Sequence, residues 1–227
     1  MSGPRRTFAD LKNECYLRLQ NRYHRFESGR RLPKNECKLS TCVLVSTSLQ
    51  RVRFTTAEYM RMASILAGRR TELIDGEIIE MAPIGTPHLL VVTHLAVQLH
   101  ALHAQMRLLV QQPLIVGQFD EPQPGLIVLR EPLGHRKPRI EDCLLIIEVS
   151  DSSYATDAAI KLPVYLAAGA PAVWIVNISN HADPLVEIWA PGMREPTVTR
   201  DAVSVAGITV PLDTVFDGLA EITDDEE

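Results

Sequence analysis

From residue 54 onward, the spacing of hydrophobic and polar residues changes from a helical period to a strand-like alternation. Thr55 and Glu58 have the spacing of a capping box, which predicts a helix over residues 56–67 that ends at the following glycine. The next segment, TELIDGEIIEM, alternates hydrophobic residues on both sides of Asp75-Gly76. This pattern predicts a β-hairpin with a two-residue turn.

A long helix is predicted over residues 86–109, because Thr86-Pro87 is a typical helix start and hydrophobic residues then recur at helical spacing. The residues expected to form its hydrophobic stripe are Leu89, Val92, Leu95, Leu99 and Leu102.

The second half of the chain alternates short hydrophobic runs with one further helix. Runs over 113–119 and 125–130 predict strands, and CLLIIEVS and AVWIVNIS read as strands buried on both faces. A helix is expected over 157–169, and PLVEIWA with residues 197–210 should supply edge strands. This order predicts one α/β (α+β) domain with a mixed central sheet.

Composition and charge divide the chain into parts. The 227 residues are 46% hydrophobic and 22% charged, which is typical of a globular protein, and no run of 18 apolar residues suggests a membrane span. The net charge of −5 combines +8 over residues 1–53 with −13 over the remainder. We therefore predict a basic, poorly ordered extension over 1–53, a domain over 54–220 and an acidic tail over 221–227.

The basic extension admits several interpretations. Hydrophobic residues at helical spacing allow a basic amphipathic helix that contacts phosphates or an acidic partner, and a misplaced gene start is the alternative. A zinc knuckle could use Cys15, His24, Cys37 and Cys42, although these spacings match no standard zinc finger. The N-terminus has no hydrophobic core of a signal peptide, so we expect reduced cysteines and a cytoplasmic location.

Three residues are candidates for phosphodiester chemistry. Glu72 lies in the first hairpin strand, Glu148 near the end of CLLIIEVS, and Lys161 in the following helix. Lys161 shares a helix face with Asp157 and Tyr165, because each lies four residues away. Carboxylates at strand ends can hold Mg²⁺, while a lysine stabilises negative charge on the phosphate. A solvated strand-end glutamate and a surface ion pair are the simpler alternatives.

Several motifs, spread in unbroken order over about residues 54–217, resemble the Uma-type putative restriction endonuclease family of the PD-(D/E)xK nuclease superfamily. The matching segments are FTTAEYMRM, TELIDGEIIEMAP, His88, QPGLIVLR, LLIIEVSDSS, DAAIKLPVYLAAGAPAVWIVN and VPLDTVF. The resemblance implies a restriction-endonuclease-like fold with a mixed sheet flanked by helices. It also implies metal-dependent DNA cleavage with Mg²⁺ or Mn²⁺, with DNA as partner, no membrane, and a homodimer as candidate assembly.

Carried over to this sequence, Glu148 matches the family's second acid and Glu72 an additional acid, so these two are the expected metal ligands. Lys161 matches the family's lysine, and Ser150 occupies the nearer place two residues after the acid. Asp157 and Tyr165 match positions that accompany the lysine.

The sequence departs from the family at its principal metal ligand. The family's Pro-Asp is Pro124-Gly125 here, so the metal-binding carboxylate is missing. Asp120 and Glu121 lie nearby, but the intervening turn gives no reason to aim either at a metal. Asn177 stands where the family often has an aspartate. The sequence thus predicts a nuclease of weakened or lost activity, with a non-catalytic nucleic-acid- or protein-binding homologue, or a degenerating gene product, as alternatives.

Other candidate sites are weaker. His88, His94, His100 and His103 fall on one predicted helix without the spacing of a HExxH site, so core or surface roles are expected. The basic residues His135, Arg136, Lys137 and Arg139 form a loop that could contact the phosphate backbone or lie free in solvent. Cys143 begins a buried strand and is expected to be a small core residue.

Overall fold

The computed structural model describes residues 52–222, which belong to the unit Gln50–Glu227, the second of two into which the chain divides. Most of the basic extension, including the candidate zinc ligands, and residues 223–227 of the acidic tail lie outside the described residues. Within residues 52–222, no helix has the length and apolar character needed to cross a membrane.

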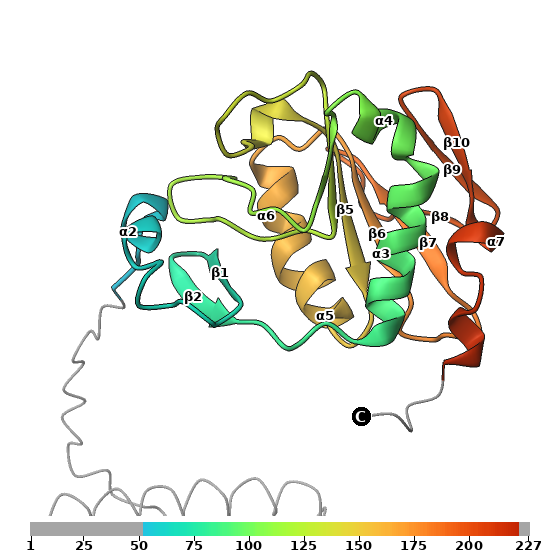
Figure 1. Ribbon diagram of the computed structural model, residues 1–227, viewed down its shortest axis with the longest axis horizontal. Helices are drawn as coiled ribbons and strands as arrows, with labels where there is room; N and C mark the ends of the chain where they lie inside the picture. Colours follow the sequence, from blue (N-terminus) through green and yellow to red (C-terminus); the bar gives the residue numbers. More distant parts are fainter. Residues whose placement is uncertain (1–51, 223–227) are drawn as a thin grey trace, which may run out of the picture. The chain divides into compact units, whose positions relative to one another are not determined.

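A six-stranded sheet forms the centre of this unit (Figure 1). Strands β5 and β6 are parallel, and all other neighbouring pairs are antiparallel, so the predicted mixed sheet is confirmed. In sheet order the strands are β3 (Leu108–Val110), β4 (Leu126–Leu129), β5 (Cys143–Ser150), β6 (Val173–Asn177), β7 (Leu185–Trp189) and β8 (Thr197–Thr199). A short 3₁₀ turn, η1 (Ile140–Asp142), leads into β5.

The parallel pair requires a crossover, which one continuous helical segment provides. It consists of α5 (Tyr154–Thr156), the π-helical η2 (Asp157–Lys161) and α6 (Leu162–Ala167). Pro163 has no N–H to donate, so the regular α-helical ladder is interrupted at this point. The helix predicted over 157–169 begins earlier, at Tyr154, and ends two residues sooner, at Ala167. Gly169 follows it in the left-handed conformation, with φ 91°.

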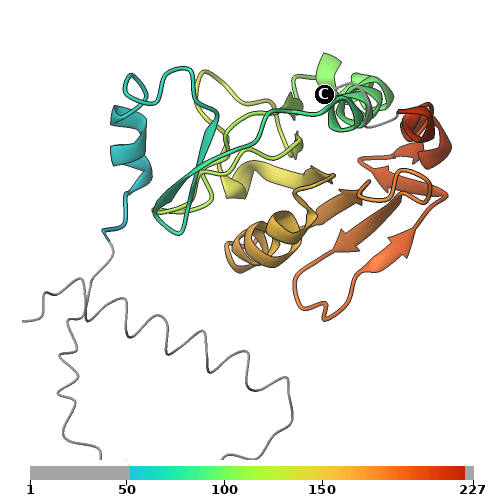
Figure 2. The same ribbon diagram turned by 90° about the horizontal axis from the view of Figure 1, so that it is seen from below.

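Helices cover both faces of the sheet (Figure 2). Alternate side chains of a strand point to opposite faces, so Ile147 packs in the cluster that includes α3, whereas Ile146 packs with Tyr165 of α6. Both faces of β5 and β6 are thus buried, which explains why these strands read as near-continuous hydrophobic runs.

The predicted capping box and hairpin are both present. Thr55 accepts a hydrogen bond from the Glu58 N–H, and the Glu58 carboxylate accepts one from the Thr55 N–H. The hairpin consists of β1 (Thr71–Ile74) and β2 (Glu77–Glu80), and its turn residues Asp75 and Gly76 have φ of 50° and 75°.

The helix α2 is shorter than predicted, because it spans only Thr56–Arg61 instead of 56–67. None of its residues is buried, so packing does not extend it.

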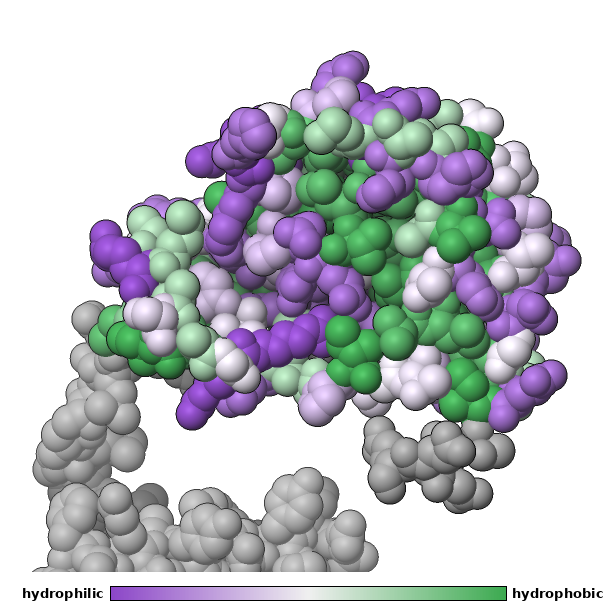
Figure 3. Space-filling model, viewed as in Figure 1, coloured by the Kyte–Doolittle hydropathy of each residue, from purple (hydrophilic) through white to green (hydrophobic). Residues whose placement is uncertain are grey.

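The prediction of one long helix over residues 86–109 is wrong in its second half. The segment divides into α3 (Thr86–Gln98) and α4 (His100–Ala104), and Met106 then adopts φ 56°. Residues 108–110 then form β3, because they pair with the free edge of β4. Four of the five expected stripe residues are buried, but Leu89 is 55% exposed. Hydrophobic residues gather over α3 on the face that Figure 3 shows.

Two further strand predictions need correction. Residues 113–119 form no strand, since both edges of β4 are already paired. The backbone of this segment bonds instead to the nearby loops at 120–122 and 138–140 and, at its end, to Thr56 and Gly76. The expected edge strand β7 lies inside the sheet, and β8 is the edge. Residues 202–211 form a separate hairpin, β9 (Ala202–Val205) and β10 (Ile208–Pro211), followed by α7 (Leu212–Val215) and η3 (Leu219–Glu221).

Candidate functional site

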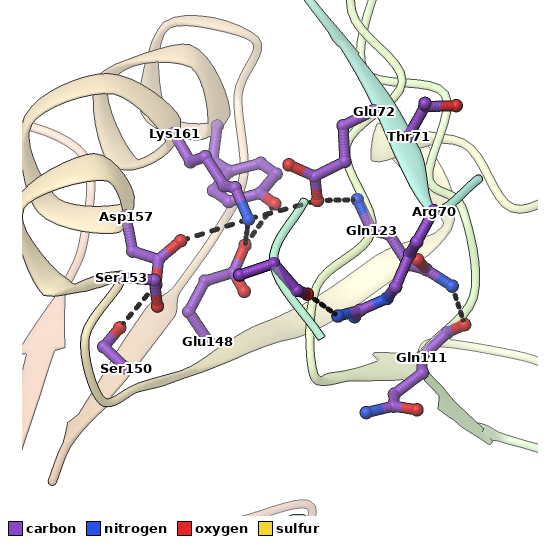
Figure 4. Close-up of polar contacts among 12 residues, drawn as sticks. Arg70, Thr71, Glu72, Gln111, Gln123, Glu148, Ser150, Ser153, Asp157 and Lys161 are labelled. Carbon is purple, nitrogen blue, oxygen red and sulfur yellow. Dashed lines mark hydrogen bonds and ion pairs between the residues drawn. The ribbon is translucent and has the colours of Figure 1, made fainter. Parts of the chain in front are cut away.

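Lys161 lies at the centre of three buried carboxylates (Figure 4). Its Nζ atom is 3.1 Å from Glu72 Oε1, 3.6 Å from Glu148 Oε1 and 3.1 Å from Asp157 Oδ1. All four side chains are at most 5% exposed. The structure therefore brings together the three candidate residues Glu72, Glu148 and Lys161, with Asp157 beside them; we call these four residues the lysine–carboxylate cluster.

Three elements supply the members of this cluster. Glu148 alternates with Ile147 and so points to the sheet face that the crossover helix covers. Asp157 and Lys161 are four residues apart in η2, where their ion pair is a helical neighbour contact. Glu72 comes from β1, outside the central sheet, and closes the cluster from the other side.

Neutral hydrogen-bond donors complete the cluster. The Tyr165 hydroxyl donates to Glu148 Oε1 at 2.6 Å, and the backbone N–H of Gln123 donates to Glu72 Oε1 at 2.7 Å. The hydroxyls of Ser150 and Ser153 donate to Asp157 Oδ2 at 2.8 Å and 2.6 Å.

Gln123 and Ser153 were missed by the sequence analysis. The position of Ser153 four residues before Asp157 was a usable signal, because side chains at this spacing meet on a helical turn. The backbone donor from Gln123 leaves no trace in the sequence, because any residue type except proline carries that N–H.

Burial changes the protonation of the cluster. Burial raises the pKa of Glu148 from its ordinary 4.5 to about 8; Asp157 and Glu72 raise it as well, while Lys161 and the Tyr165 hydroxyl oppose the rise. Burial alone lowers the pKa of Lys161, but the surrounding carboxylates overcome this effect and hold it above its ordinary value. The cluster thus contains a firmly charged ammonium and a Glu148 that retains a proton in neutral solution.

Gly125 lies directly against β5 at the level of Glu148. Its neighbour Leu126 pairs with Ile147, so position 125 comes opposite Glu148 in the β4–β5 register. A Cβ atom at this position would lie 3.2 Å from the Ile147 carbonyl oxygen and 3.5 Å from the Val149 nitrogen. Glycine permits this close approach, and an aspartate would have to displace the start of β4 by a few tenths of an ångström.

The nearby acids do not replace the missing aspartate. Asp120 Oδ1 accepts a hydrogen bond from the Asp75 N–H at 2.7 Å, and the buried Glu121 forms an ion pair with Lys137. Asn177 lies at the end of β6, where its side-chain oxygen accepts hydrogen bonds from the backbone and hydroxyl of Ser179.

His88 lies near the cluster, in the first turn of α3. Its Nε2 atom is buried and has no hydrogen-bond partner among the described residues. Burial lowers the pKa of His88. The charges of Arg70 and Lys161 lower it further, and those of Asp157 and Asp151 oppose them.

The remaining candidate residues have local structural partners. His94 and His100 each bond a backbone carbonyl at 3.0 Å, and Cys143 is a buried free thiol.

A divalent metal does not fit this arrangement as it stands. Carboxylate oxygens are the ligands that Mg²⁺ and Mn²⁺ prefer, but here an ammonium lies among them and one carboxyl retains its proton. Position 125 supplies no side chain. Among residues 52–222, no group of three or more acidic, histidine or cysteine side chains has a geometry that could hold a metal ion.

Comparisons with known proteins point to nucleases. The family model described as "Uma2: Putative restriction endonuclease" matches residues 56–220. The structure is similar to the crystal structure of a putative nuclease belonging to DUF820 from Anabaena variabilis ATCC 29413, with a TM-score of 0.57 and 16% identity over 73% of this chain and 99% of that chain. At this identity the likeness concerns the fold. A search of the curated proteins finds no match.

Proposed function

This chain belongs to the Uma2 putative restriction endonuclease family, as its sequence motifs predict, and we propose that it is a DNA-binding member in which phosphodiester hydrolysis is strongly weakened. The fold and the family support a nuclease ancestry. The weakening is inferred from the lysine–carboxylate cluster and from the glycine at position 125.

The observation that carries this proposal is the surroundings of Lys161. An ammonium group has three N–H donors, and three carboxylates lie within 3.6 Å of Nζ. A phosphate oxygen can therefore contact Nζ only by displacing one of these carboxylates. Because the cluster already balances Lys161 internally, it is better suited to stabilising the fold than to stabilising negative charge on a phosphate.

A carboxylate at position 125 should restore metal binding at this site. Aspartate there would add an anionic oxygen beside Glu148, and a divalent cation that binds between the two carboxyls favours release of the proton that Glu148 otherwise retains. We expect Gly125→Asp to gain thermal stability with millimolar Mg²⁺ or Mn²⁺ by mass action, whereas the wild type gains little. Gly125→Asn is the matched control, because it adds the same bulk at the tight β5 contact without the charge.

Nicking of supercoiled plasmid tests the function itself. We expect little Mg²⁺- or Mn²⁺-dependent nicking by the wild type, nicking by Gly125→Asp but not Gly125→Asn, and loss of that activity when Lys161→Ala is added. Efficient nicking by the wild type would refute the proposed weakening. Failure of Gly125→Asp to bind metal, with its melting temperature otherwise normal, would show that position 125 is not the missing ligand.

The alternative is a homologue that only binds nucleic acid or protein. DNA binding that falls steeply with salt, needs no metal and stays without nicking in Gly125→Asp would favour this alternative. If the protein binds no DNA even at low salt, both the weakened nuclease and the non-catalytic nucleic-acid-binding homologue are contradicted.

A further inference from the structure

Two hollows in the surface adjoin each other beside the lysine–carboxylate cluster. The first has a volume of about 580 Å³ and lies between α2, β1 and the segment that precedes β4, and the second, of about 590 Å³, lies beside α4, β3 and the basic loop. Pro113 and Lys137 line both hollows, so the two meet at these residues. We call them the first and second hollow.

Positive charge is concentrated in these hollows. Residues 54–222 contain 11 Lys or Arg and 20 Asp or Glu. Four of the eleven basic residues line the hollows, namely Arg69, Arg70, Arg136 and Lys137, but only one of the twenty acidic residues, Glu121, does so. A basic path on an otherwise acidic domain indicates an anionic ligand.

Lys137 is held at the junction of the two hollows. Its ammonium forms an ion pair with Glu121, whose side chain is only 1% exposed, while the lysine side chain itself is 39% exposed. The buried carboxylate therefore fixes the position of Lys137 and leaves part of it accessible to a ligand. The Arg69–Glu80 pair on the rim, at 3.6 Å between exposed side chains, is weak and readily exchanged for a phosphate.

The walls of the hollows are apolar between these charges. Tyr59, Met60 and Leu66 line the first hollow, and Met106, Leu109 and Leu133 line the second. Single-stranded nucleic acid is bound by this combination, since its backbone follows positive charge while its unpaired bases pack on aromatic and apolar side chains. A duplex hides the faces of its bases and cannot use such walls.

The first hollow reaches the lysine–carboxylate cluster. Thr71 and Gln123 line it; Thr71 directly precedes Glu72, and the Gln123 backbone donates to the Glu72 carboxylate. Arg70 and Gln123 lie beside Glu72 in Figure 4. A strand in the hollows would thus pass next to the cluster.

We propose that the two hollows form a binding track for one DNA strand, which crosses Lys137 and runs past Glu72. This inference rests on the proposed function for its choice of DNA, but it requires neither metal nor cleavage. The phosphates contact Arg70 in the first hollow, Lys137 at the junction and Arg136 in the second, and the bases pack on the apolar walls.

Fluorescence anisotropy in EDTA tests the track with a labelled 20-nucleotide single strand and its duplex. The first variant combines Arg70→Gln and Arg136→Gln, one in each hollow. Because Arg136 also forms an ion pair with both oxygens of Asp142, whose side chain is 16% exposed, the melting temperature of Arg136→Gln alone is measured too. Each lost phosphate contact should weaken binding about fivefold at 0.1 M salt and reduce the slope of log K against log salt by about 0.7. We therefore expect the double variant to bind the single strand roughly 25-fold more weakly, with a slope lower by about 1.4.

The control is Arg194→Gln, which removes one positive charge, as Lys137→Gln does, but from an exposed position outside both hollows. It should leave binding unchanged. Lys137→Gln should weaken binding by about fivefold, and its amide can still donate to Glu121. Melting temperatures check that each variant is folded.

The outcomes separate this inference from the proposed function. Double-variant binding within twofold of wild type, or an equal effect of Arg194→Gln, would overturn the track even if Gly125→Asp nicks plasmid. Tighter binding of the duplex than of the single strand would overturn the single-strand assignment. Loss of binding in the double variant alone would support the track even if no variant cleaves DNA.

Discussion

Removing the ammonium of Lys161 should expose how strongly the lysine–carboxylate cluster depends on it. Lys161→Met keeps most of the buried aliphatic stem and deletes the charge that lies within 3.6 Å of Glu72, Glu148 and Asp157. Breaking a buried ion pair by removing one partner costs about 3–5 kcal/mol, because it leaves an uncompensated buried charge. For a domain of this size that loss lowers the melting temperature by roughly 6–20 °C.

The loss of stability caused by this substitution should grow as pH rises. At low pH Glu148 holds its proton, so less negative charge is left unbalanced when Lys161 is removed. As pH rises, Glu148 must either ionise without a cation beside it or keep a proton that the unfolded chain releases. The destabilisation should therefore be small near pH 5 and grow toward pH 8, by at most about 1.4 kcal/mol per pH unit for each proton retained.

Urea unfolding followed by circular dichroism between pH 5 and pH 8.5 measures this effect. Arg69→Met is the control, because its ion pair with Glu80 is exposed and should be worth about 0–1 kcal/mol. A Lys161→Met protein within about 1 kcal/mol of the wild type at pH 8, or a cost that does not change with pH, would refute the reasoning.

Three further predictions concern single residues. Glu148→Gln should remove a pH dependence: burial raises the pKa of Glu148 to about 8, so wild-type stability falls between about pH 4.5 and pH 8, because the unfolded chain releases this proton while the folded protein still holds it, and the variant should show a flatter profile in urea unfolding. Thr55→Ala should cost about 1 kcal/mol in the same assay through loss of the capping box, and a neutral result would mean that α2 does not contribute to stability. Leu95→Ala should cost about 2–5 kcal/mol because Leu95 is fully buried, whereas Leu89→Ala should be nearly neutral; equal costs would contradict the observed orientation of α3.

The sequence alone determined the features that depend on neighbouring residues. The capping box of Thr55 and Glu58 and the turn at Asp75-Gly76 follow from local hydrogen bonding and from the positive φ that the turn requires. The strands β5 and β6 follow from hydrophobic runs too long to be left exposed. The family motifs, read together, also led to the correct family and fold.

The tertiary structure decided which distant residues meet. Residues 108–110 continue a helical pattern in the sequence, but they form β3 because β4 offers an unpaired edge, whereas 113–119 bond to neighbouring loops and join no strand of the sheet. Local propensity cannot predict such outcomes, since the competing hydrogen bonds come from segments far along the chain.

The same reason applies to the candidate site. The spacing of Asp157 and Lys161 predicted their contact, and the family motifs placed Glu72 at the same site. No sequence signal gave the 3.1 Å distance from Glu72 to the ammonium or placed Glu121 beside Lys137. The raised pKa of Glu148 likewise comes from burial between the sheet and the crossover helix. Charge, burial and distance in this site are properties of the packed domain, because they arise only when separate segments exclude water together.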